Sequence, residues 1–253
     1  MSADVMGAII ESYLKRLKLP AIAREYGALA REAELGNVGY LGYLQALLEQ
    51  EVRQRDEHQL ARRLKQARFP YDKRLEEFDF STVRSIAKAR VFELARGAFV
   101  RDHENLILIG ASGLGKTHLL IGLGRALCFA GFSVLFRPAA SLANELELAQ
   151  KELRIERLLK QYRRYDLLLV DELGYLPVSK TAAQLLFGLF SDRYERASIG
   201  LTTNLDFAHW TEVFGDERMT AALLDRLTHR SHILALEGES YRFQQSLQRQ
   251  AGT

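Results

Sequence analysis

The feature that most constrains this chain is a glycine-rich motif that follows a short apolar run at 106–109. Glycine permits backbone angles closed to other residues, so successive N–H groups can line a concavity that fits phosphate oxygens. The segment after the motif has a helical pattern, and a helix N-terminus adds the positive end of its dipole. The pattern therefore predicts a strand, a phosphate-binding loop and a helix. The spacing G-x-x-x-x-G-K-[ST] is filled by Gly110, Ala111, Ser112, Gly113, Leu114, Gly115, Lys116 and Thr117.

Two side chains at the end of this motif predict the kind of phosphate ligand. Lys116 can reach the β and γ phosphates of a nucleoside triphosphate as a point charge. The Thr117 hydroxyl can ligate the Mg²⁺ that bridges them. We therefore expect ATP and Mg²⁺ as cofactors. The alternative is a glycine-rich turn without a ligand, which the flanking strand and helix patterns make a poorer explanation.

Short apolar runs and helical patterns alternate along the rest of the chain. This alternation predicts an α/β fold, a doubly wound five-stranded parallel sheet with ligands at the carboxyl ends of its strands. An amphipathic segment at 83–100 leads into the first strand. The expected strands are 106–109, 134–136, 167–170, 199–203 and 232–236, and the expected helices are 116–130, 140–165 (a helical region), 181–196 and 207–229.

The first seventy residues have a different pattern, with apolar residues at helical spacing and few strand signals. They predict a small all-α N-terminal domain at 1–70, in which Pro20 opens a second helix and a third begins after Asn37. Residues 71–82 are expected to be an irregular linker, and 83–253 the nucleotide-binding domain. Only about seventeen residues follow Leu236, so we expect no full multi-helix lid at the C-terminus.

The composition indicates where in the cell the protein is found, but it says less about what the protein does. With 47% hydrophobic residues, the 253-residue chain can bury a full α/β core and a smaller second domain. The single cysteine, Cys128, has no partner for a disulfide, and no apolar run approaches the roughly 20 residues that cross a bilayer. These features favour a cytoplasmic protein without a membrane partner. The net charge of +3 decides nothing about nucleic acid.

Polar residues follow two of the apolar strands. Asp171 and Glu172 come directly after the strand at 167–170, where Asp171 can hold Mg²⁺ and Glu172 can orient the water that attacks the γ-phosphate. Asn204 follows the strand at 199–203, and reaches the same site if that strand lies between the strands of Gly110 and Asp171. The alternative for all three is an ordinary turn residue.

Two regions are rich in basic residues. One is the helical segment 53–68, and the other lies between the second and third core strands. Such clusters can neutralise DNA phosphates without reading sequence. Because apolar residues interleave the charges, the alternative is an amphipathic helix with a solvated face. The second region comprises Lys151, Arg154, Arg157, Lys160, Arg163 and Arg164.

Five motifs, taken in order, resemble the IstB family. Members of that family are AAA+ ATPases that help insertion-sequence transposases, and they are related to DnaC-type helicase loaders. The resemblance covers nearly the whole chain, since 67–70 and 78–80 also resemble that family's junction between its N-terminal domain and its ATPase core. The five motifs are Gly-Ala-Ser-Gly-Leu-Gly-Lys-Thr at 110–117, Leu-Leu-Leu-Val-Asp-Glu-Leu-Gly-Tyr at 167–175, Leu-Thr-Thr-Asn at 201–204, Leu-Leu-Asp-Arg-Leu at 223–227 and Gly-Glu-Ser-Tyr-Arg at 238–242.

The resemblance implies roles for three further residues and a set of partners. Asn204 would be the first sensor, Arg226 an arginine finger inserted into the site of the next subunit, and Arg242 a second sensor in its own subunit. A delocalised guanidinium suits charge spread over phosphoryl oxygens. Arg226 as a surface ion-pair partner and Arg242 as an ordinary exposed charge are the alternatives. The implied partners are duplex DNA, a transposase, and further copies of the chain in a ring or spiral.

The sequence therefore favours an ATP-dependent DNA-transposition helper that oligomerises on DNA. The nearest alternative is a DnaC-like replicative helicase loader, which uses the same ATPase core on a different protein partner. A small-molecule phosphotransferase and a non-hydrolysing DNA scaffold are further alternatives, against which the sensors, the finger and Glu172 argue.

Overall fold

The computed structural model describes residues 3–175, 177–238 and 240–241 of the chain. Contacts divide the chain into two compact units, Met1–Arg62 and Arg63–Thr253. The first unit contains α1 (Ala3–Arg16), α2 (Pro20–Leu35) and most of α3 (Tyr40–Ala67), so the three predicted helices are present. Pro20 stands at the start of α2, where its missing N–H breaks no helical hydrogen bond. Within the described ranges, no helix is both long and apolar enough to cross a membrane.

A buried carboxylate joins two helices of the first unit. Glu51 on α3 is 4% exposed, and its Oε2 accepts hydrogen bonds from the backbone N–H groups of Ala21 (2.9 Å) and Ile22 (3.3 Å). Its Oε1 accepts from Arg55 Nε at 2.9 Å. Burial raises the pKa of Glu51, but the bonds from Arg55 and the two backbone N–H groups outweigh it, so the pKa lies below its usual value. Glu51 therefore caps the N-terminus of α2, whose first N–H groups have no partner inside the helix.

The second unit contains the predicted parallel sheet. In the described residues the sheet has five strands in the order β2-β3-β4-β1-β5, each parallel to its neighbours. The strand bounds are β1 (Asn105–Gly110), β2 (Val134–Pro138), β3 (Leu167–Leu173), β4 (Ser198–Thr203) and β5 (Ser231–Leu236). The expected doubly wound α/β fold is confirmed, and it brings the carboxyl ends of β3, β4 and β1 side by side.

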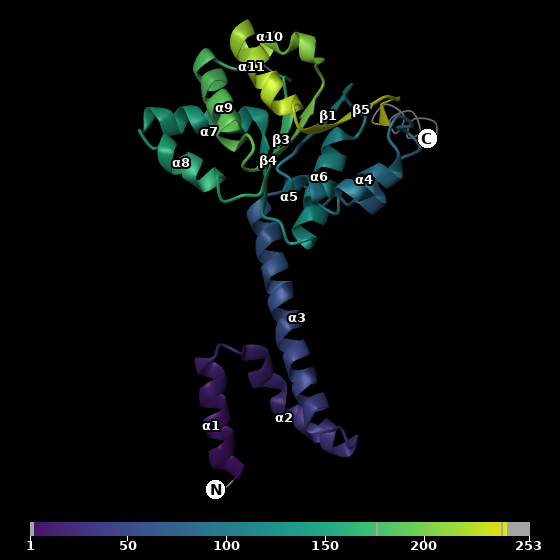
Figure 1. The fold of residues 1–253 in the computed structure, drawn as a ribbon, viewed down its shortest axis with the longest axis vertical. Coiled ribbons are helices and arrows are strands. Elements are labelled where there is room, and N and C mark those ends of the chain that lie inside the picture. The colour runs from purple at the N-terminus through teal and green to yellow at the C-terminus, as the bar shows by residue number, and fades with distance from the viewer. Residues whose placement is uncertain (1–2, 176, 239, 242–253) are drawn as a thin grey trace, which may run out of the picture. The chain divides into compact units, whose positions relative to one another are not determined.

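Helices cover both faces of this sheet, which gives three layers (Figure 1). On one face, strand residues such as Ile107, Leu168 and Leu201 share a core with α7, α9 and α11. On the other face lies α6, whose Leu120 lies near Gly200 of β4 and whose Gly124 lies near Leu169 of β3. The helices of this unit are η1 (Leu75–Glu77), α4 (Lys88–Leu94), α5 (Ala98–Arg101), α6 (Lys116–Phe129), α7 (Ala139–Lys151), α8 (Ile155–Tyr162), α9 (Lys180–Arg193), η2 (Phe207–His209), α10 (Thr211–Phe214) and α11 (Glu217–Thr228).

The amphipathic segment at 83–100 forms two short helices rather than one. It divides into α4 and α5 because Gly97, between them, adopts a left-handed conformation with φ of 77°. Glycine tolerates this angle, and the chain turns there towards β1. The apolar periodicity was a correct sign of burial, since Val91 and Phe99 are buried, but it did not reveal the turn.

The segment 71–82, expected to be an irregular linker, is packed against the sheet unit. Leu75 and Phe78 are buried, and Asp72 forms an ion pair with Arg125 of α6 at 2.8 Å. Just before it, the ring of Phe69 lies 6.3 Å from that of Phe136 on β2. The division between the two units accordingly falls after Arg62, inside α3, and 71–82 belongs to the second unit.

Candidate nucleotide-binding site

The glycine-rich loop joins β1 to α6 at the carboxyl edge of the sheet. Gly113 and Gly115 have φ angles of 88° and 83°, a region that residues with a Cβ seldom adopt. A Cβ at Gly115 would lie 2.6 Å from Cε2 of Phe78, so the loop also lacks room for a side chain there. Gly115 is the N-cap of α6, and the N–H groups of the first turn therefore face the loop. This is the predicted strand, loop and helix.

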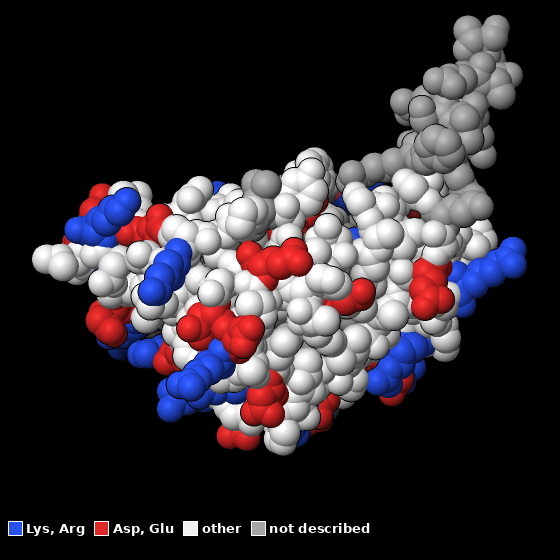
Figure 2. Space-filling view, turned by 90° about the horizontal axis from the view of Figure 1, so that it is seen from above, with Lys and Arg blue, Asp and Glu red and all other residues white. Residues whose placement is uncertain are grey.

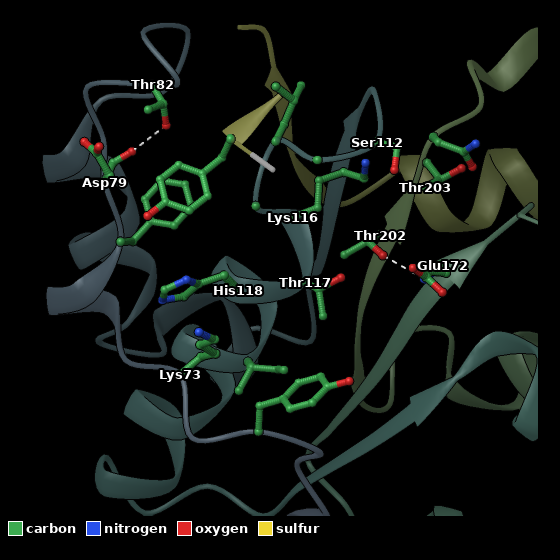
Figure 3. A pocket seen from close by; sticks show the side chains of 18 of the residues that line it. Lys73, Asp79, Thr82, Ser112, Lys116, Thr117, His118, Glu172, Thr202 and Thr203 are labelled. Carbon is green, nitrogen blue, oxygen red and sulfur yellow. Dashed lines mark hydrogen bonds between the residues drawn. The ribbon is translucent and has the colours of Figure 1, made fainter. Parts of the chain in front are cut away.

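Lys116 extends over the loop. Its Nζ donates to the carbonyl oxygens of Gly110 (2.6 Å) and Ala111 (2.8 Å). Figure 3 shows the ammonium group pointing towards Ser112 at the edge of a cavity. The positive charge is thus held against the loop, at the cavity that the loop lines.

Asp171 is the polar centre beneath the loop. It is 6% exposed, and its Oδ1 accepts hydrogen bonds from the hydroxyls of Thr117 (3.0 Å) and Thr202 (2.6 Å). Burial raises the pKa of Asp171, and the two hydroxyl bonds lower it by less, so the pKa lies above its usual value. Among the described residues, no hydrogen bond reaches its Oδ2. One carboxylate oxygen is therefore held by two hydroxyl groups, and the other accepts no hydrogen bond within the described ranges.

This donor set fits Mg²⁺. The hydroxyl of Thr117 and the carboxylate of Asp171 are hard oxygen donors in direct contact. No group of three or more His, Cys, Asp or Glu that could hold a metal occurs in the described part of the chain. A site with few protein ligands suits Mg²⁺, which usually keeps several waters and takes further oxygens from substrate phosphates.

Glu172 points away from the core at an irregularity of the sheet. The register of β3 against β4 shifts between Val170 and Leu173, and Glu172 has a φ of 60°, uncommon for a residue other than glycine. Its backbone N–H donates to the Thr202 hydroxyl at 2.8 Å, which helps to hold this conformation. The side chain is exposed and lines the cavity (Figure 3). Asp171 and Glu172, adjacent in sequence, are thus directed to different places.

Asn204 lies at the same edge. It follows β4, and β4 lies between β3 and β1, as the prediction for Asn204 required. Its side chain is exposed and lines the cavity with Lys116 and Glu172. The strand order therefore brings Glu172 and Asn204 to the cavity that the phosphate loop lines.

The cavity has a volume of about 350 Å³, within the range of small-molecule sites. Its lining contains residues that sequence reasoning missed, including Phe78. Lys73 and His118 lie across the cavity from Glu172 (Figure 3). The rings of Phe78 and His118 meet edge-on at 5.4 Å, and His118 Nε2 contacts the carbonyl oxygen of Arg74 at 2.8 Å. The aromatic pair at 78 and 80 was visible in the sequence, but its place at the site depends on how 71–82 packs.

Thr202 is a second residue that the sequence reasoning missed. It is fully buried and contacts both Asp171 and the Glu172 backbone. The available signal was a threonine inside a buried, otherwise apolar strand, because a buried hydroxyl needs a hydrogen-bond partner.

Arg226 lies elsewhere, on α11. It is half-buried, its guanidinium carbon is 5.1 Å from the centre of the Phe187 ring, and its Nη1 donates to the Ser191 hydroxyl. It is not among the residues that line the cavity of its own chain. Its role as a finger stays a prediction, and Arg242 lies outside the described residues.

The basic residues at 151–164 are all exposed, at the end of α7 and along α8. Two have acidic partners. Arg163 binds Asp192 through Nε and Nη2, both at 2.8 Å, and Arg154 pairs with Glu152. The apolar Leu158 and Leu159 pack against the core, so α8 is amphipathic. On the face drawn in Figure 2, positive and negative side chains are interspersed, and DNA binding stays a prediction.

Comparison with known proteins identifies close relatives. A putative ATP-binding protein of insertion sequence IS21 from Pseudomonas aeruginosa is 44% identical over 243 residues, which is 96% of this chain and 91% of the relative. A putative ATP-binding protein of insertion sequence IS5376 from Geobacillus stearothermophilus is 36% identical over 93% of this chain and 94% of that one.

Solved structures confirm the fold. AMPPCP-bound DnaA from Aquifex aeolicus has a TM-score of 0.57 at 22% identity, over 72% of this chain and only 56% of that one. DnaI has a TM-score of 0.56 at 18% identity, over 66% of this chain and 92% of that one. The fold is that of P-loop AAA+ proteins. A family model described as IstB-like ATP binding protein matches residues 12–249. On this match and on the identity with its relatives, the chain belongs to the IstB-like ATP-binding proteins.

Proposed function

We propose that this protein is an ATP-dependent helper of DNA transposition. In this proposal it assembles on duplex DNA, hydrolyses ATP at the interfaces between its copies, and recruits or stimulates a transposase. The observation that carries the proposal is the phosphate loop beside a buried Asp171 and an exposed Glu172 at one sheet edge. Relatives named for insertion sequences support the biological setting.

The loop and its lysine would hold the triphosphate. Backbone N–H groups of the loop and the first turn of α6 would bind phosphate oxygens, with Lys116 at the β and γ phosphates. Thr117 and Asp171 would hold Mg²⁺, which supplies positive charge to the phosphate oxygens when bound. Because Asp171 Oδ1 already accepts from two threonines, Oδ2 would serve the ion or one of its waters.

Residues on the neighbouring strands would carry out the hydrolysis. Glu172 would orient a water towards the γ-phosphorus and accept its proton as the bond to the β–γ bridging oxygen breaks. Asn204 would donate its amide hydrogens to a γ-phosphate oxygen. Arg226 of a neighbouring copy would stabilise the charge that spreads over the transferred phosphoryl group.

ATP held between two copies would favour the assembled state, and its hydrolysis would release it. The exposed cations of α8, Arg157 and Lys160, would contact DNA phosphates and make binding depend on salt. Arg163 is a weaker candidate, because its guanidinium already binds Asp192.

The test of the site is Lys116→Ala, with Lys180→Ala as the matched control. Lys180 is exposed at the start of α9 and does not line the cavity. We expect Lys116→Ala to weaken ATP binding by roughly 100-fold or more and to abolish ATP-dependent assembly on DNA in electron micrographs. Parent-like nucleotide binding and assembly by this variant would refute the proposal.

The protein partner requires a separate test. Immobilised protein, loaded with ATP and duplex DNA, is offered a transposase from an insertion sequence of the same kind and a replicative helicase. Retention of the transposase alone is expected. Retention of the helicase alone would mean that the ATPase serves helicase loading instead.

A further inference from the structure

Arg226 differs from its neighbouring arginines in what holds it. Arg163 is bound by a carboxylate, and the fully buried Arg193 is bound by carbonyl oxygens from 162, 165 and 198. Arg226 instead contacts the face of the Phe187 ring and the hydroxyl of Ser191. Phe187 and Ser191 are one helical turn apart on α9, so both face α11.

These contacts orient the guanidinium without neutralising it. An aromatic face attracts a cation within about 6 Å, and a hydroxyl accepts one hydrogen bond, but neither carries a negative charge. No carboxylate lies within ion-pair distance of Arg226 among the described residues. Its charge therefore stays available to an anion, whereas a carboxylate partner would compete with phosphate for the same N–H groups.

The helix that makes these contacts is packed into the core. On α9, Leu186 and Phe190 are buried in the core that α7, α9 and α11 share with the sheet. On α11, Leu223 lies one helical turn before Arg226 and is fully buried, so this part of α11 is also packed against the core. An arginine side chain loses rotamer entropy when it binds, so holding it in one orientation beforehand removes part of that loss.

We propose that Phe187 and Ser191 are positioning residues, a neutral cradle that orients Arg226 towards the ATP of a neighbouring copy. This inference rests on the proposed function, because it requires the shared site. It goes further in assigning a task to two residues that do not line the nucleotide cavity of their own chain. The cradle acts in the copy that donates the arginine.

The test uses mixtures of two variants. The acceptor carries Arg226→Ala, so it has an intact ATP site and no finger. The donor carries Glu172→Gln, so it has a finger and cannot hydrolyse its own ATP. Mixing them with DNA restores ATPase activity if the site is shared. Into the donor we then add Phe187→Leu or Ser191→Ala, with Phe187→Tyr as the conservative control, since tyrosine keeps the aromatic face.

We expect Phe187→Leu in the donor to lower the restored kcat by about 5- to 10-fold, with KM for ATP little changed. Ser191→Ala is expected to lower it by about 2- to 5-fold. Phe187→Tyr retains most of the rate. Phe187→Leu placed in the acceptor, whose residue 226 is already alanine, leaves the restored rate unchanged.

The outcomes separate the two proposals. No restoration with the unmodified donor refutes the shared site itself. If Phe187→Leu and Ser191→Ala in the donor leave the restored ATPase rate unchanged or increase it, the cradle is refuted but the shared site is not. An equal loss from donor and acceptor placement would show a general structural defect, and it also refutes the cradle. Melting temperatures and ATP affinity of each variant are measured alongside to identify such a defect.

Discussion

In the part of the chain that the structure describes, each unit buries one carboxylate, and the two are held by different donors. Glu51 in the helical unit is 4% exposed and Asp171 in the sheet unit is 6% exposed. Glu51 accepts from two backbone N–H groups and the Arg55 guanidinium, and its pKa is lowered. Asp171 accepts from two hydroxyls on a single oxygen, and its pKa is raised because burial outweighs them.

The difference matches the two roles assigned to these carboxylates, a helix cap for Glu51 and the proposed Mg²⁺ ligand for Asp171. A buried anion is stable when the protein supplies enough donors and charge, and Glu51 meets that condition within its own unit. At Asp171 burial outweighs the two hydroxyl bonds and the charge of Lys116, and in the proposed function Mg²⁺ would stabilise the charged form. Burial alone therefore does not distinguish a helix cap from a candidate metal ligand, whereas the donors around each carboxylate do.

The largest expected effect follows from removing the charge of Asp171. Asp171→Asn keeps the size of the side chain and an acceptor oxygen, but cannot hold Mg²⁺ as well. We expect the ATPase kcat to fall by roughly 10²- to 10³-fold, while the fold is retained. Steady-state ATPase assays and circular dichroism check this. The exposed Asp206→Asn is the control, and activity near the parent's in Asp171→Asn would remove the functional side of the comparison.

The second prediction concerns Glu51. Glu51→Ala removes the acceptor for two N–H groups of α2 and leaves Arg55 without its carboxylate. We expect a loss of about 2 kcal/mol in the stability of the helical unit, with little change in ATP binding. Hydrogen exchange at the amides of Ala21 and Ile22 reports this locally. The exposed Glu57→Ala is the control, and unchanged protection in Glu51→Ala would show that the cap is dispensable.

A smaller effect is expected at Thr202. Thr202→Val preserves the shape of the side chain and removes one donor to Asp171 and one acceptor for the Glu172 N–H. The expected result is a loss of about 1 kcal/mol in the free energy of activation, roughly a fivefold lower kcat/KM at limiting Mg²⁺. Titrating ATPase activity against Mg²⁺ measures it. A parent-like curve would mean that Thr202 does not support Asp171.

The smallest expected effects, and the most diagnostic, are those of pH on the melting temperature Tm of two variants. Because folding lowers the pKa of Glu51, this residue stabilises the fold at pH above its pKa in the unfolded chain. The stabilisation is lost as pH falls through its pKa in the folded protein. Because folding raises the pKa of Asp171, its contribution to folding stability is most favourable at pH below its pKa in the unfolded chain. That contribution is lost as pH rises through its pKa in the folded protein. Glu51→Gln should therefore lower Tm most at neutral pH, whereas Asp171→Asn should raise it there.

Both Tm differences should shrink towards about pH 3 to 4, where ordinary carboxyl groups protonate. Thermal melts of the parent and both variants across this range, without nucleotide or Mg²⁺, provide the measurement. If the two differences had the same sign at neutral pH, the contrast between the two carboxylates would be wrong.

The parts of the site that sequence could predict are those set by local backbone geometry. The phosphate loop was predictable because glycine spacing and a strand-to-helix junction dictate its shape. Asp171, Glu172 and Asn204 were predictable because each follows an apolar strand, and the order β3-β4-β1 confirmed that they share an edge. The family resemblance added Arg226 and Arg242, whose roles stay predictions.

The remainder depends on contacts between distant parts of the chain. Arg163 meets Asp192 and Arg226 meets Ser191 only because α8, α9 and α11 pack together. Phe78 reaches Gly115 because 71–82 folds onto α6, although its sequence resembles a linker. The turn at Gly97 was equally hidden, since the periodicity of apolar residues continues through it. Long-range packing of this kind leaves little trace in local composition.

The order of strands has a consequence for control. Neighbouring parallel strands lie about 4.8 Å apart, so the groups on β3, β4 and β1 occupy a row about 10 Å long, held in place by backbone hydrogen bonds. Because these groups are fixed on adjacent strands, conformational change within one chain has little scope to turn catalysis on or off. If one catalytic charge comes from a neighbouring copy, the rate of ATP hydrolysis depends on how many copies have assembled. Disassembly driven by hydrolysis can then begin only after assembly.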